Sequence, residues 1–184
     1  RLEYFGGLKQ EDRMINDKEC SIILTLAGST SAAGCMQVYV DMVKNKMVDC
    51  IVSTGASIID MDFFEALGFK HYKGTPFIDD KYLRSNYIDR IYDTYIDEEE
   101  LQNCDSTIKL IADRLEKRPY SSREFIWEIG KWLSEGNAKK TDSLIQACLN
   151  ILSANPLFFI INAYTTGISS TVLYNILKTS LFKQ

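Results

Sequence analysis

Two short runs of small, hydroxyl-bearing residues are the segments of this sequence best suited to hold a ligand. The residues of interest are Ser29, Thr30 and Ser31 in residues 27–34, and Ser53, Thr54 and Gly55 in residues 53–57. Small residues let a backbone approach a pyrophosphate, and hydroxyl groups can donate hydrogen bonds to it. The first run is not a GxGxxG fingerprint, because only Gly28 and Gly34 frame it. Two hypotheses stay open: a phosphate or dinucleotide loop, and a tight strand-to-helix turn without a ligand.

Titratable side chains follow the second run. Asp60, Asp62 and Glu65 stand at the start of the next predicted helix, and His71 is the sole histidine of the sequence. Beside a cofactor, such a carboxylate can hold a cationic amine through charge-assisted hydrogen bonds. It can equally be a solvated residue favoured by the helix dipole. His71 is either a general base or a partly buried polar residue.

The five cysteines point to buried, reduced thiols. Their number is odd, none forms a CxxC pair, and a single histidine is present. Zinc sites use closely paired cysteine and histidine ligands, so we expect no metal site. Free cysteines in apolar surroundings behave as small core residues.

The two runs must be positioned by a strand–loop–helix pattern that occurs twice. Apolar, β-branched residues predict strands over residues 21–26 and 47–52. Helical spacing of apolar residues predicts helices over residues 35–46 and 58–67, the second ended by Gly68. This order is typical of a βαβ unit in a parallel sheet covered on both faces. Since ligands bind where parallel strands end, both runs should lie at the carboxyl edge of the sheet.

The rest of the chain reads mainly as helices. Residues 81–95 could be helix or irregular structure, and residues 97–117 form a predicted helix whose first turn is acidic. Ser121 and Glu124 have the spacing of a capping box, which would open a helix to about residue 134, before Gly136. A further helix should begin near Asp142.

Composition is that of an ordinary globular domain. The sequence has 184 residues, of which 46% are hydrophobic and 25% charged, with a net charge of −4. The negative balance argues against nucleic acid as the main partner. The most apolar stretch, residues 157–161, is far shorter than the roughly 20 residues of a membrane helix. The chain starts at Arg1, with no signal segment, so we expect a cytoplasmic protein without a membrane partner.

The sequence resembles the deoxyhypusine synthase family, and especially its bacterial deoxyhypusine synthase-like branch. The resemblance covers roughly residues 4–148, in several segments that follow family order. The matching segments are TLAGSTSAAG (25–34), NKMVD (45–49), IVSTGAS (51–57), DMDFFEALG (60–68), RIYDTYI (90–96) and PYSSREF (119–125).

The resemblance implies a Rossmann-like α/β fold, a homotetramer, and NAD bound between paired subunits. Such enzymes oxidise spermidine by hydride transfer to NAD and pass its aminobutyl group, through an enzyme lysine, to an acceptor amine. The acceptor is a lysine of the hypusine-bearing translation factor, or a free polyamine in relatives that make homospermidine. By resemblance, the contacts to NAD would come from Ser29, Thr30, Ser31, Ser53, Thr54 and Gly55. Asp60 would bind the polyamine.

The C-terminal part departs from the family pattern. The family's catalytic lysine lies in a Ser-Trp-Gly-Lys context that is absent here, and Lys131 lies in the capped helix instead. The match fades beyond Cys148, and residues 165–170 lack the aspartate that would help to bind NAD. We therefore expect a tail (1–20), a family α/β domain (21–148) and a divergent strand–helix segment (149–184). If the fold is incomplete, the chain would be a fragment of the enzyme that lacks the catalytic lysine. Alternatively, it would serve as a non-catalytic NAD-binding or oligomerising module.

Overall fold

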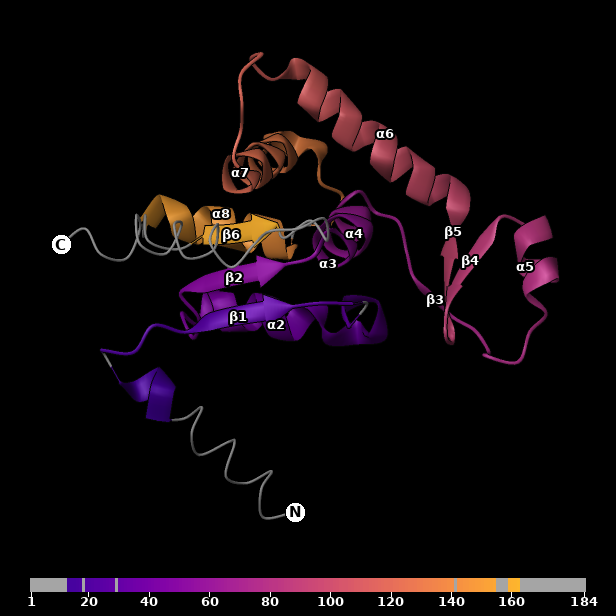
Figure 1. Ribbon diagram of the computed structural model, residues 1–184, viewed down its shortest axis with the longest axis horizontal. Helices are drawn as coiled ribbons and strands as arrows, with labels where there is room; N and C mark the ends of the chain where they lie inside the picture. The colour runs from indigo at the N-terminus through magenta and orange to yellow at the C-terminus, as the bar shows by residue number, and fades with distance from the viewer. Residues whose placement is uncertain (1–12, 18, 29, 141, 155–158, 163–184) are drawn as a thin grey trace.

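A parallel sheet forms at the two predicted strands and at a third segment far along the chain (Figure 1). The computed structural model describes residues 13–17, 19–28, 30–140, 142–154 and 159–162. The strands β1 (Ile23–Leu26), β2 (Cys50–Ser53) and β6 (Phe159–Asn162) lie in the order β1-β2-β6, with both pairings parallel. The predicted α/β class and parallel sheet are thus confirmed, and β6 lies within residues 149–184, where a strand was expected.

The second strand begins later than predicted. Residues 47–49 belong to the turn after α2 (Met36–Lys44), because the amides of Lys46 and Met47 donate to carbonyl groups in that helix. Lys46 has a φ of 55°, which directs the chain away from helical geometry. The Asp49 carboxylate accepts the Ile22 amide at 2.7 Å and so fastens this turn to the start of β1.

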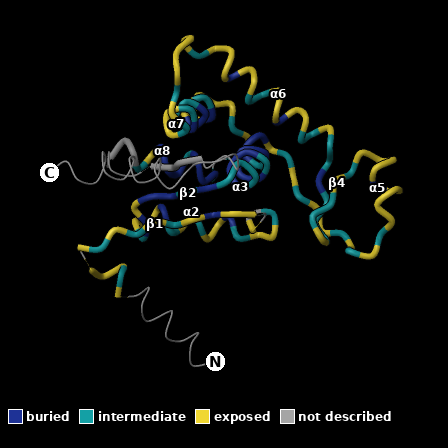
Figure 2. Tube along the Cα trace, viewed as in Figure 1, coloured by how far each residue is buried: buried dark blue, intermediate teal, exposed yellow. Residues whose placement is uncertain are grey.

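Helices pack on the parallel sheet and bury the core. The run after β2 consists of α3 (Gly55–Ser57), η2 (Ile58–Phe63) and α4 (Phe64–Ala66), and Gly68 ends it with a φ of +93°. The helix α7 (Ser122–Trp132) contacts α8 (Leu144–Ala154) and β6, and α8 also contacts α2. Fully buried side chains along these contacts include Val40, Val43, Ile51, Phe63, Phe64, Ile129 and Leu144. Figure 2 shows this buried centre along β2 and α3.

Helix boundaries follow their capping residues. Asp97 caps α6 (Glu98–Arg114) by accepting the amides of Glu99 and Glu100, which confirms the acidic first turn. The helix ends at Arg114 rather than near residue 117, with Leu115 already extended. Both hydrogen bonds of the predicted Ser121–Glu124 capping box are present at the start of α7. The π-helical turn η3 (Leu133–Asn137) follows α7 and contains Gly136 with a φ of +93°.

A second, antiparallel sheet replaces the helix or irregular structure predicted for residues 81–95. Only α5 (Asp80–Ser85) is helical there, and β4 (Ile88–Ile91) and β5 (Thr94–Asp97) form a hairpin. The short β3 (Tyr72–Lys73) completes the order β3-β5-β4, beside the parallel sheet in Figure 1. Tyr92 turns the hairpin with a φ of 56°. Two-residue hairpin turns usually contain Asn-Gly or Asp-Gly, and a tyrosine at this position does not indicate a turn in the sequence.

Buried thiols belong to this core. Cys50, Cys104 and Cys148 are buried, and burial raises the pKa of Cys50 and of Cys104 to about 12. The described residues include no group of three or more His, Cys, Asp and Glu side chains placed to hold a metal ion. Within the same residues, none of the helices has the length and apolar character needed to cross a membrane.

Candidate functional site

The two small-residue runs meet at the carboxyl edge of the parallel sheet. Leu26 at the end of β1 is paired with Ser53 at the end of β2, so both runs leave the sheet side by side. The Thr54 amide donates to the Leu26 carbonyl at 3.1 Å, and the Ser57 hydroxyl donates to the Gly28 carbonyl at 2.7 Å. The shared edge predicted from the βαβ pattern is confirmed, and Ser57 adds a link between the runs that the sequence did not predict.

The first run keeps its backbone open on one side. Gly28 and Gly34 have φ values of +74° and +93°, and no atom lies within 4 Å of a Cβ built at either position. The π-helical turn η1 (Ser31–Cys35) leads into α2 and has no acidic residue in its first turn. The Thr30 hydroxyl accepts a hydrogen bond from the Tyr39 hydroxyl at 2.9 Å. Ser29 lies outside the described residues, and only the backbone of Ser31 is described.

The second run contains a buried hydroxyl that lacks a partner. Ser53 is buried, and its hydroxyl donates to the Thr54 carbonyl at 3.2 Å. The hydroxyl oxygen of Thr54 is also buried but has no hydrogen-bond partner among the described residues. Gly55 opens α3, again with no atom near a built Cβ. Most buried hydroxyls in proteins are paired, so the unpaired Thr54 hydroxyl marks a position where a ligand could supply the missing partner.

A cleft of about 400 Å³ lies between η1 and the antiparallel sheet. Its walls are Ala32, Ala33 and Gly34 on one side, and His71, Tyr72, Lys73, Asp93 and Thr94 on the other. The small side chains leave room for an extended ligand such as a dinucleotide, and Lys73 offers it a cation beside the carboxylate of Asp93. Lys73 and Asp93 could not be predicted as site residues, because the hairpin that carries Asp93 gave no signal in the sequence.

The three carboxylates after the second run serve three different purposes. Asp62 is fully buried and accepts the amides of Leu144 and Ile145 at 2.7 and 2.9 Å, so it caps α8. Burial raises the pKa of Asp62 to about 7, against the two amide hydrogen bonds, which lower it. Asp62 therefore has a structural role, as the cap of α8.

Glu65 joins two cationic or polar side chains. Its Oε1 lies 3.0 Å from His71 Nδ1, and its Oε2 forms an ion pair with Lys140 Nζ. The hydrogen bond from His71 is the main cause that lowers the pKa of Glu65, and Lys140 adds to it. His71 is therefore a partly buried, partnered residue, and its ring also lines the cleft beside η1. Lys140 thus pairs with Glu65 across 75 positions of the sequence.

Asp60 is the carboxylate that stays available. It is half-buried in η2, and its pKa is raised by burial and by the negative charge of Asp105 on α6. Two neighbouring carboxylates repel each other unless a proton or a cation lies between them. A cationic amine would relieve this repulsion, so Asp60 and Asp105 together have the chemistry of an amine-binding pair.

Comparison with known proteins gives the same family over most of the chain. The deoxyhypusine synthase family model matches residues 6–155. A deoxyhypusine synthase-like protein of Caulobacter vibrioides is 73% identical over 130 residues, which are 71% of this chain and 35% of that protein. A protein of the same description from Coxiella burnetii is 67% identical over 135 residues, 73% of this chain and 38% of the relative. The chain thus spans little more than a third of these relatives.

A solved structure gives the fold independently. A crystal structure from Entamoeba histolytica, assigned to deoxyhypusine synthase, superposes with a TM-score of 0.52 at 20% identity. The match covers 86% of this chain and 46% of the Entamoeba histolytica chain. With the family model matching residues 6–155, the chain belongs to the deoxyhypusine synthase family, a family of transferases.

Proposed function

We propose that this chain supplies an NAD-contacting wall of a deoxyhypusine synthase-like transferase, which moves the aminobutyl group of spermidine to an amine acceptor. In this proposal the acceptor is the lysine of the hypusine-bearing translation factor, and a free polyamine, as in homospermidine synthesis, is the alternative. The observation that carries the proposal is the pair of small-residue runs linked by Ser57 at the carboxyl edge, with the buried Thr54 hydroxyl in the second run lacking a partner among the described residues.

The chain's own residues would bind and orient the reactants. Gly28, Gly34 and Gly55 leave the backbone open to a phosphate. Thr54 would donate its hydroxyl hydrogen to the cofactor, and Ser29, Thr30, Ser31 and Ser53 complete the expected contacts. Asp60, helped by Asp105, would hold a cationic amine of the polyamine. When bound, NAD would accept the hydride from the carbon beside the oxidised amine.

The substitution Thr54→Val separates a cofactor contact from a structural role. Valine has nearly the shape of threonine and removes only the hydroxyl. Since that hydroxyl has no partner among the described residues, its loss should not lower the free energy of unfolding. If the hydroxyl donates to NAD, however, the dissociation constant should rise about three- to tenfold, as for one hydrogen bond of roughly 1 kcal/mol. Isothermal titration calorimetry with NAD measures the dissociation constant, and urea unfolding measures the free energy of unfolding.

Thr107→Val is the matched control. Thr107 lies on α6, and its hydroxyl donates to the Asn103 carbonyl at 2.7 Å, away from the runs. This variant should bind NAD like the unsubstituted chain. Unchanged NAD affinity in Thr54→Val would remove the argument from the unpaired hydroxyl, and absence of NAD binding to the unsubstituted chain would overturn the proposal for this chain on its own.

Catalysis in this family uses a lysine within a Ser-Trp-Gly-Lys segment. No Ser-Trp-Gly-Lys segment is present, so we expect no spermidine-dependent NADH formation from the purified chain. An intact family member, assayed by NADH absorbance under the same conditions, is the positive control. Turnover by this chain alone would refute the expectation. Light scattering of the chain mixed with that relative tests the alternative of a non-catalytic module, which predicts a defined mixed oligomer.

A further inference from the structure

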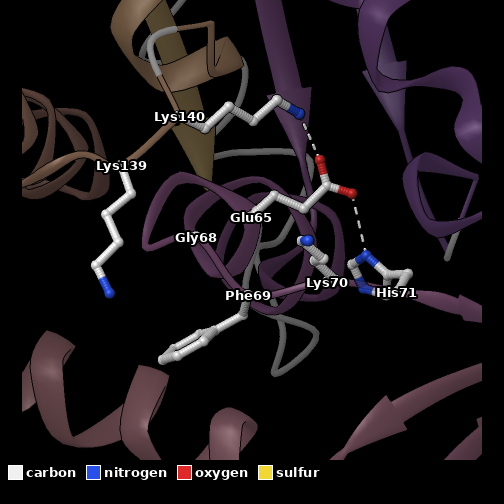
Figure 3. A pocket seen from close by; sticks show the side chains of 7 residues that line it. All are labelled: Glu65, Gly68, Phe69, Lys70, His71, Lys139 and Lys140. Atoms are coloured by element: carbon white, nitrogen blue, oxygen red, sulfur yellow. Dashed lines mark hydrogen bonds and ion pairs between the residues drawn. The ribbon is translucent and has the colours of Figure 1, made fainter.

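A second hollow, of about 660 Å³, lies at the far end of the helical run that starts beside Thr54 (Figure 3). We call it the lysine hollow, and it is lined by Glu65, Gly68, Phe69, Lys70, His71, Lys139 and Lys140. Three lysines and one carboxylate line the hollow, so it carries a surplus of two positive charges before His71 is counted. Lys140 is paired with Glu65, whereas Lys70 and Lys139 form no ion pair with any described residue.

Helix capping does not account for these lysines. A helix C-terminus attracts cations because its last carbonyl groups lack partners. Here main-chain amides already satisfy them: Gly68 N–H donates to the Glu65 carbonyl, and the amides of Lys139 and Lys140 donate to the Ala66 carbonyl. Capping of this helix therefore does not explain why Lys70 and Lys139 lie here.

The hollow is built around groups held in fixed positions. A Cβ at Gly68 would lie 2.8 Å from Lys139 Cδ, so the lysine stem crosses the bare glycine. His71 has a side chain only 6% exposed, and its Nδ1 faces Glu65. Its Nε2 is buried and has no hydrogen-bond partner among the described residues. Figure 3 shows Lys140, Glu65 and His71 as a linked row, with Lys139 on the other side of Gly68.

We propose that the lysine hollow binds a phosphate group, either free or carried by a nucleotide. A phosphate monoester has roughly 1.5 to 2 negative charges at neutral pH, and the pyrophosphate of NAD has about one on each phosphate; their acceptor oxygens suit the charge surplus and the separated donors. Lys139 and Lys70 would bind its oxygens directly. Glu65 would position Lys140 and the His71 ring, whose Nε2 lacks a hydrogen-bond partner among the described residues. This site is separate from the cleft beside η1 and does not depend on NAD binding there.

Because His71 is the sole histidine, its ring signals in a ¹H–¹³C NMR spectrum are unambiguous, and they report on the wall that the lysine hollow shares with the cleft beside η1. Titration of the full chain with inorganic phosphate, at constant ionic strength set by sodium chloride, should shift them in a saturable way. Lys139→Met keeps the stem over Gly68 and removes the charge, so it should weaken phosphate binding about three- to tenfold. Lys70→Met should act alike, and Lys139→Arg should restore most of the affinity. Lys109→Met, on exposed α6, is the control and should change nothing.

Several results would overturn the proposal. A linear shift, an equal shift with chloride, or Lys139→Met binding like the unsubstituted chain would each do so. NAD is titrated separately, because His71 also lines the cleft beside η1. A nucleotide phosphate in the lysine hollow predicts an NAD response sensitive to Lys139→Met, and free phosphate predicts a response to inorganic phosphate alone. If NAD alone shifts the signals and only Thr54→Val weakens that response, the cleft is occupied and the lysine hollow is not a phosphate site.

Discussion

The buried carboxyl of Asp62 gives the fold a specific dependence on pH. In the folded chain its pKa is about 7, raised by burial from an ordinary value of 3.8. Between these two values the folded chain keeps a proton that the unfolded chain has released, so the free energy of unfolding falls as pH rises. The difference corresponds to about 4 kcal/mol, at about 1.4 kcal/mol for each pH unit. Most of it should be lost by pH 7.

Asp62→Asn removes this dependence with little change in shape. The oxygen of asparagine can still accept the Leu144 amide, but its NH2 group cannot accept the Ile145 amide, as a protonated carboxyl oxygen can. At pH 4.5 the variant should therefore be less stable than the unsubstituted chain by about 1–3 kcal/mol. The variant should become relatively more stable as pH rises to 8, by up to about 4 kcal/mol. Urea unfolding, followed by fluorescence of Trp127 and Trp132, measures this difference at each pH.

Asp142→Asn is the matched control, because it makes the same change at a carboxyl with the opposite shift. The hydrogen bond from Lys44 lowers the pKa of Asp142, and Gln37 contributes to the same effect. A lowered pKa stabilises the fold above the unfolded value and loses that effect in acid, so this control should be flat between pH 5 and 8. A flat Asp62→Asn difference, or one that favours the unsubstituted chain as pH rises, would refute the reasoning.

Three further substitutions test local geometry. Ser121→Ala removes the acceptor of the Glu124 amide in the capping box and should lower the free energy of unfolding by about 1 kcal/mol in urea. Gly74→Ala would place a Cβ 2.1 Å from Tyr95 Cζ, so we expect a loss of about 1–3 kcal/mol by the same assay. Gly55→Ala meets no atom within 4 Å and should be close to neutral for stability. Equal effects at the two glycines would contradict the packing argument.

The parallel core was predictable because its signals are local. Continuous apolar runs identify the strands β1 and β2, and each is followed by a small-residue run and helical spacing. The caps at Asp97 and Ser121 were equally accessible, since a capping residue and its amides lie within three positions. The carboxyl-edge position of both runs then follows from parallel pairing alone.

The antiparallel sheet was not predictable from such signals. Its hairpin turns at Tyr92 with a positive φ, which a tyrosine adopts only where the surrounding structure imposes it. The polar alternation of residues 88–97 is compatible with helix or strand, and tertiary contacts decide between them. The cleft beside η1 therefore gained a wall, including Lys73 and Asp93, that no pattern in the sequence indicated.

The helical run after β2 shows why a carboxylate near a cofactor loop is a weak site prediction. Its polar side chains look alike in the sequence, yet the structure gives three of them distant partners of different kinds. Ser57 reaches Gly28, Asp62 caps a helix that begins 82 residues later, and Glu65 holds His71 and Lys140. Among the described residues Asp60 has no such partner, and its pKa is raised by burial and then by the charge of Asp105. A cationic partner for Asp60 would therefore have to come from outside the described chain, and in the proposed function an amine of the polyamine would supply it.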